Sequence, residues 1–125
     1  MPVATIAIPP NPEHVRTVRM VAGAAARRGR VPEEVIDEVR LAVGEAVARV
    51  VLRHERAGTD SDVRVHLRDD PEAFEVEIED SAPADLPDDD GGISIALTQS
   101  LVPQCSVLPT DKGSQIFRLI WPLDG

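Results

Sequence analysis

Apolar side chains recur along the chain with two distinct periods, which divide it into helical and extended segments. Over residues 12–29 and 32–58 the spacing is three or four, as on one face of a helix. Each segment opens with proline and glutamate and reaches a glycine, Gly29 or Gly58, at its end. The sequence therefore predicts two helices, and the second, at about 25 residues, is long enough to form the spine of the domain.

Alternation of apolar and polar residues with a period of two marks the strands. It is strict over 63–67 and 74–78, which the turn residues 69–72 separate as a hairpin. The remaining segments are predicted as strands over 3–8, 105–108 and 115–121, a loop over 81–92 and a short helix over 93–102. This order predicts an α/β sandwich, in which helices pack on one face of a mixed, mostly antiparallel sheet.

Composition and charge narrow the possible functions. The chain has 125 residues, 42% of them apolar and 28% charged, which predicts one globular domain over 1–125. Its net charge of -9 argues against nucleic acid as a ligand but suits a basic protein partner. No apolar run reaches the roughly 18 residues of a membrane helix, and no signal pattern is present. Because Cys105 has no partner for an internal disulfide, we expect a cytoplasmic protein without membrane contact.

The element order, the long second helix and the hairpin that ends in Asp80 resemble the Bergerat (GHKL) ATP-binding fold over nearly the whole chain. In particular, the chain resembles the small anti-sigma-factor serine kinases of bacterial partner-switching systems. In that family the long helix carries a glutamate that acts as general base, and four residues later an asparagine that ligates magnesium. Glu45 matches the glutamate, whereas Arg49 stands at the position of the asparagine.

The other motifs of this family are matched in part. Its Asp-x-Gly-x-Gly motif, whose aspartate binds the adenine amino group, corresponds to Asp80 followed by Ser81-Ala82-Pro83-Ala84, with alanine for both glycines. Alanine at a positive-φ position costs roughly 1 kcal/mol, and its methyl group hinders close approach of a ligand. The resemblance therefore implies a degenerate candidate ATP site made of Asp80, Arg49, Gly91, Gly92, Gly113 and Ser114, with Glu45 as the candidate base.

Two interpretations of Arg49 follow from its chemistry. A guanidinium only donates hydrogen bonds, so it cannot ligate magnesium, but it could contact a phosphate directly. Alternatively, Arg49 forms an intrahelical ion pair with Glu45, four residues earlier and in the favoured orientation. The acidic run 88–90 is either a solvated turn or a loop that repels a triphosphate. We therefore expect ATP to bind weakly at most, and no magnesium to bind.

The resemblance implies a regulatory protein of the anti-sigma-factor type with little or no kinase activity. Its partner would be a sigma factor or the anti-anti-sigma antagonist protein, and a homodimer is expected. The alternative is an active ATP-dependent serine/threonine protein kinase, in which Glu45 is the base, Asp80 binds adenine and Arg49 clamps phosphate. A third hypothesis is a scaffold with unrelated partners, because a fold does not determine function.

Overall fold

The computed structural model describes residues 3–123, and its five-stranded sheet has the order β1-β2-β3-β5-β4. The strands are β1 (Val3–Ile8), β2 (Val63–Asp70), β3 (Ala73–Asp80), β4 (Gln104–Pro109) and β5 (Gln115–Pro122). All four pairings are antiparallel, so the parallel pair expected of a mixed sheet does not occur. The physical reason is that β5 lies between β3 and β4, which run in the same direction but are not neighbours.

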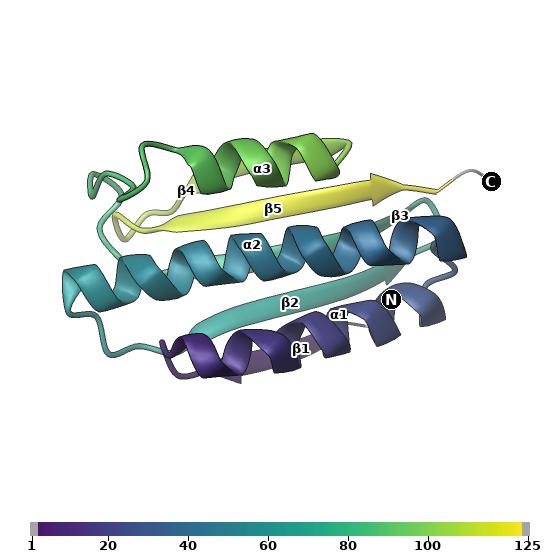
Figure 1. The fold of residues 1–125 in the computed structure, drawn as a ribbon, viewed down its shortest axis with the longest axis horizontal. Helices are drawn as coiled ribbons and strands as arrows, with labels where there is room; N and C mark the ends of the chain where they lie inside the picture. The colour runs from purple at the N-terminus through teal and green to yellow at the C-terminus, as the bar shows by residue number, and fades with distance from the viewer. Residues whose placement is uncertain (1–2, 124–125) are drawn as a thin grey trace.

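Three helices cover one face of this sheet, which confirms the predicted α/β sandwich (Figure 1). They are α1 (Val15–Arg28), α2 (Glu33–Ala57) and α3 (Ile93–Leu101), and one 3-10 turn (Pro12–His14) precedes α1. The Asn11 side chain caps this turn by accepting a hydrogen bond from the Glu13 backbone N–H at 3.1 Å. The second helix, α2, stops at Gly58, whose φ of +68° is left-handed. Among residues 3–123, no helix has the length and apolarity to cross a membrane.

The core lies between the helices and the sheet and consists mainly of aliphatic side chains. From the sheet, alternate residues point into it: Val63, Val65, Leu67, Phe74, Val76, Ile78, Phe117, Leu119 and Trp121. From α2, the predicted stripe is buried against them: Val39, Ala42, Val43, Ala46, Val47 and Val50. Because α2 lies between α1 and α3 and packs on the sheet, it also buries polar side chains near its C-terminal end.

The opposite face of the sheet carries a ladder of charges. Glu75, Glu77 and Glu79 alternate along β3, and β2 and β5 place basic side chains beside them. Arg118 on β5 pairs with Glu75, and Arg68 on β2 lies 3.6 Å from Glu77. The hydrogen bond to Glu75 raises the pKa of Arg118 above its ordinary value. Opposite charges on adjacent strands stabilise the pairing of β3 with β2 and β5 on this face, which no helix covers.

Candidate functional site

Three arginines of α2 face the loop that follows β3, residues 81–92. Arg49, Arg53 and Arg56 are spaced by four and three residues, which puts them on one side of the helix. Each donates to the loop, and the most exposed of them, Arg56, donates from Nη1 to the carbonyl of Pro87 at 2.6 Å. We call these three residues the arginine row. It joins the C-terminal half of α2 to this loop.

Arg53 forms a buried ion pair with Asp80, the last residue of β3. Their side chains are 3% and 1% exposed, and Arg53 Nε donates to Asp80 Oδ2 at 2.6 Å. The other carboxylate oxygen, Oδ1, accepts from the backbone N–H of Ala82 at 3.0 Å. Arg53 Nη1 and Nη2 donate to the carbonyls of Leu86 and Pro83 at 2.6 and 2.9 Å. These bonds offset the loss of hydration that burying two charges entails.

Arg49 pairs with Asp88 and not with Glu45. Its Nε lies 3.2 Å from both oxygens of the Asp88 carboxylate, and its guanidinium lies over the Phe117 ring, 5.4 Å from the centroid. Asp88 Oδ1 is also 3.4 Å from Arg53 Nη1. The predicted intrahelical Glu45–Arg49 pair is therefore wrong, because Arg49 faces inward under the loop, where it binds Asp88. Arg49 Nη1 is buried and has no hydrogen-bond partner among residues 3–123.

His54 anchors the start of the same loop. Its ring is fully buried, with Nδ1 3.1 Å from the Ser61 carbonyl and Nε2 3.0 Å from the backbone nitrogen of Ser81. Because the Ser81 N–H donates, Nε2 must accept, and the ring proton lies on Nδ1. A ring in this tautomer is neutral, so the 3.7 Å approach of Nε2 to Asp80 Oδ1 is not an ion pair. His54 thus fixes the position of the Ser81 backbone without adding charge.

The other end of the loop turns into α3 through Gly91 and Gly92, whose φ angles of +66° and +92° require glycine. Asp90 caps the helix by accepting from the backbone N–H groups of Gly92 and Ser94, each at 3.0 Å, and from the Ser94 hydroxyl at 2.6 Å. The Ser94 hydroxyl is the main reason that the pKa of Asp90 lies below its ordinary value. The acidic run 88–90 is therefore more than a solvated turn.

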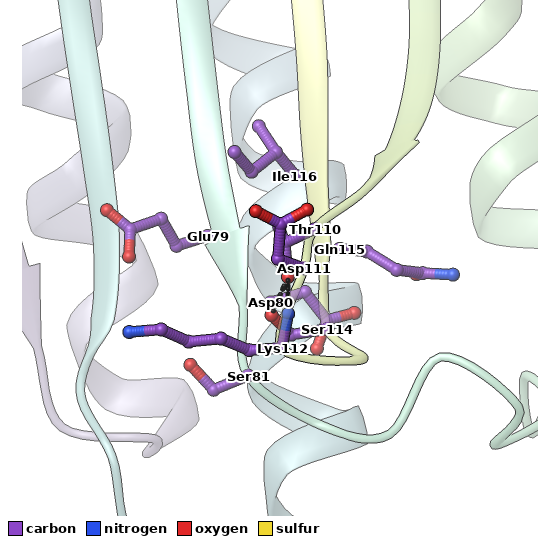
Figure 2. Close-up of a pocket in the computed structure, with 9 residues that line it drawn as sticks. All are labelled: Glu79, Asp80, Ser81, Thr110, Asp111, Lys112, Ser114, Gln115 and Ile116. Carbon is purple, nitrogen blue, oxygen red and sulfur yellow. Dashed lines mark hydrogen bonds between the residues drawn. The ribbon is translucent and has the colours of Figure 1, made fainter.

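A hollow of about 310 Å³ lies where β3 ends and the β4–β5 hairpin turns. Figure 2 shows the residues that line it. Glu79 and Ile116, which pair in register, line it together with Ser114. Both alternate with residues that face the helices, and the lining also includes Asp80, the partner of Arg53. Gly113 turns the hairpin with a φ of +78°, and its carbonyl accepts from the backbone N–H of Ala84 at 3.0 Å. This bond ties the hairpin to the start of the loop.

The family described as the histidine kinase-like ATPase domain matches residues 8–121, nearly the whole described chain. The chain belongs to this family. No curated protein matches the chain. The matched range contains α2, β3, the loop 81–92 and the final hairpin, and therefore the whole arginine row. Membership in a histidine kinase-like ATPase family makes nucleotide binding the first activity to test against the geometry.

The residues at the end of β3 do not fit an adenine ring in this arrangement. The resemblance assigns the adenine contact to Asp80, but Arg53 and Ala82 already bind both of its oxygens. A base that took the place of the Arg53 guanidinium at Oδ2 would leave a buried charge without its partner. Arg49 offers donors alone, so this position supplies no ligand for a metal ion. In this histidine kinase-like ATPase domain, Asp80 and Arg49 are each bound by side chains of the chain itself, whereas Ser114 lines the open hollow together with Asp80.

The structure brings only some of the sequence-predicted site residues together. Asp80 and Arg49 share one network, but Arg53 and Asp88 link them, and neither of these was predicted. Arg53 could have been found, because it lies four residues after Arg49 on a helix face that is otherwise apolar, where a charge needs a partner. Glu45 lies apart: its side chain is half-buried and makes no hydrogen bond or ion pair within residues 3–123.

Proposed function

We propose that the protein is a regulator of the anti-sigma-factor type that acts by binding another protein, with a degenerate ATP site and little or no kinase activity. The observation that carries this proposal is the Arg53–Asp80 pair. Removing one partner from a buried ion pair costs about 3–5 kcal/mol. One hydrogen bond from an adenine amino group to a carboxylate is worth about 1.5–3 kcal/mol, which does not compensate. Exchange of Arg53 for adenine is therefore unfavourable.

A protein partner is supported by the surface next to the loop. The short helix α3 buries only Thr98 and exposes Ile93 and Leu97, at 61% and 48%. These two residues are four apart and form one apolar face, and the acidic loop 81–92 immediately precedes them. With a net charge of -9, the surface complements a basic partner with apolar anchors. We propose a sigma factor or the antagonist protein as that partner, and a homodimer as the assembly.

A binding experiment with purified proteins tests the proposed partner. Purified sigma factors and antagonist proteins from the source organism would be passed over the immobilised chain at low and high salt. We expect one of them to bind with a salt-sensitive affinity that Ile93→Asp abolishes. Met20→Asp is the matched control, because it makes the same change at a 67% exposed position on α1. Failure of every candidate to bind the wild type would overturn the proposed regulator.

Calorimetry with ATP, with and without magnesium, tests the nucleotide site. We expect at most weak binding to the wild type, without any dependence on magnesium, and no tighter binding to Arg49→Asn, because Arg53 still occupies Asp80 in that variant. Tight magnesium-dependent binding by the wild type would refute a degenerate site.

An active serine/threonine protein kinase is the second candidate, since Glu45 is half-buried and unpaired within residues 3–123, as a base would need to be. It predicts ATP-dependent phosphate transfer to the antagonist protein that Glu45→Gln abolishes. Glu38→Gln is the matched control, because Glu38 is an exposed glutamate of the same helix. Transfer that survives Glu45→Gln would exclude Glu45 as the base.

A further inference from the structure

Residues 91–110 carry no charged side chain, although 28% of the chain is charged. We call them the uncharged segment, and they contain both α3 and β4. Among residues 3–123, eight large apolar side chains are exposed, and the uncharged segment holds four of them: Ile93, Leu97, Val107 and Leu108. In Figure 1 β4 lies behind α3, and the two elements are in contact. A concentration of exposed apolar side chains of this kind marks an interaction surface.

β4 is an edge strand, and its free side has no neighbouring strand within residues 3–123. Thr110 donates its backbone N–H to the Ser114 carbonyl at 3.0 Å, so every second residue counted back from Thr110 turns its backbone groups toward β5. The residues between them, Cys105, Val107 and Pro109, turn theirs to the free side. Pro109 fits this alternation, because proline has no N–H and is tolerated where that group would face outward. The N–H groups of Cys105 and Val107 are therefore available to another strand.

We propose that an extended segment of the partner protein adds to β4, antiparallel to it, as a sixth strand of the sheet. Residues of the added strand that lie opposite Cys105 and Val107 share their side of the sheet. That side carries the helices, because Cys105 and Val107 pair with the core residues Leu119 and Phe117. Apolar side chains of the added strand therefore lie on the side of α3 and Val107, and main-chain hydrogen bonds to β4 supply affinity.

The charges around the uncharged segment indicate the sequence character of the added strand. The acidic loop 81–92, which precedes α3, and the turn 110–114, which follows β4 and carries Asp111, lie at the same end of the molecule (Figure 1). The opposite end of the segment, around Pro103, is uncharged. A strand antiparallel to β4 begins at the acidic end. The segment that fits has basic residues at its N-terminal end, followed by alternating apolar residues.

A second copy of the chain fits this edge poorly. Pairing of β4 with its own copy would place the two α3 helices over adjacent strands, which are about 5 Å apart. Packed helices need about 8–10 Å between their axes. A lone strand brings no helix of its own, so it avoids this collision. The inference rests on the proposed function in one respect: the bound molecule is a protein.

Fluorescence anisotropy with a labelled synthetic peptide and the full chain measures strand addition. The peptide alternates isoleucine and threonine after lysines at its N-terminal end. We expect Val107→Pro, which removes one outward N–H, to weaken binding about tenfold. The matched control is Val107→Thr, which keeps the N–H and the β-branched shape and should bind as the wild type does. Unchanged binding by Val107→Pro, or no binding by the wild type, would overturn the proposal.

Methylated peptides cover the case in which Val107→Pro does not fold, because they are tested on the wild type. Methyl groups on the backbone nitrogens of the isoleucines, which face β4, should abolish binding, whereas methyl groups on the threonine nitrogens should be tolerated. Binding of the isoleucine-methylated peptide would overturn strand addition.

Sedimentation distinguishes the other occupant. A wild-type dimer that Val107→Pro dissociates would overturn the proposal in favour of a second copy at β4, whereas an assembly state that this substitution leaves unchanged supports a free edge. A failed peptide experiment leaves the binding of purified sigma factors or antagonist proteins untouched, so the two proposals fail separately.

Discussion

Replacing Arg53 by alanine should destabilise the fold more than a typical substitution. The variant leaves Asp80, 1% exposed, without its counter-charge, and leaves the carbonyls of Pro83 and Leu86 without their donor. Breaking a buried pair from one side costs about 3–5 kcal/mol. Domains of this size have a free energy of unfolding of about 5–15 kcal/mol, so a large fraction of the stability is lost. The melting temperature should fall by about 10–20 °C.

Urea denaturation followed by circular dichroism measures this loss. Arg56→Ala is the matched control, because its side chain is exposed and bonds one loop carbonyl, so it should lose less than about 1 kcal/mol. The double variant Arg53→Met/Asp80→Asn removes both charges. Its loss of unfolding free energy should be about 2 kcal/mol smaller than the sum of the losses of the single variants Arg53→Met and Asp80→Asn. An Arg53→Ala loss below about 1 kcal/mol, or strict additivity in the cycle, would refute the role given to this pair.

Two further predictions concern groups with shifted pKa values. The lowered pKa of Asp90 means that its ionised carboxylate stabilises the fold above its ordinary pKa of 3.8, and that this contribution disappears as pH falls below 3.8 through the folded-state pKa. The difference in urea midpoint between the wild type and Asp90→Asn should therefore shrink from about pH 7 to about pH 3, and a constant difference would contradict the cap. Burial raises the pKa of the Cys105 thiol above its ordinary value of 9.0, and the charge of Arg49 opposes this rise. Disulfide exchange with an aromatic disulfide reagent should be slow at neutral pH and slower still in Arg49→Met, whereas a faster reaction in that variant would mean that Arg49 does not face Cys105.

Much of the fold could be predicted because its signals are local. The capping side chain of Asn11, the stop at Gly58 and the period of α2 all act between residues a few positions apart. The hairpin strands were predicted too short, since β2 continues to Asp70 and β3 begins at Ala73. Asp69 and Asp70 were predicted to belong to the turn because their side chains are typical of turns. In the structure they pair with Phe74 and Ala73 of β3, which holds them extended.

The candidate site was predicted only in outline. Asp80 and Arg49 were identified through motif positions, and the structure places both in one network. The partner of Arg49 was misassigned, because helix spacing suggests Glu45 while the choice depends on which side of α2 the loop covers. Gly91 and Gly92 were assigned only to the candidate ATP site, and the structure shows that their positive φ angles turn the loop into α3.

The sequence by itself determined the helices and strands, the apolar faces through which they pack, and the presence of a charged, metal-incompatible residue on α2. Only the tertiary structure decided that β5 lies between β3 and β4, that Arg53 binds Asp80 and that Asp88 meets Arg49. The physical reason is the separation along the chain. Periodicity acts over one or two helical turns, whereas these ion pairs join residues 27 and 39 positions apart. Their pairing follows from the sheet and the loop that bring them together.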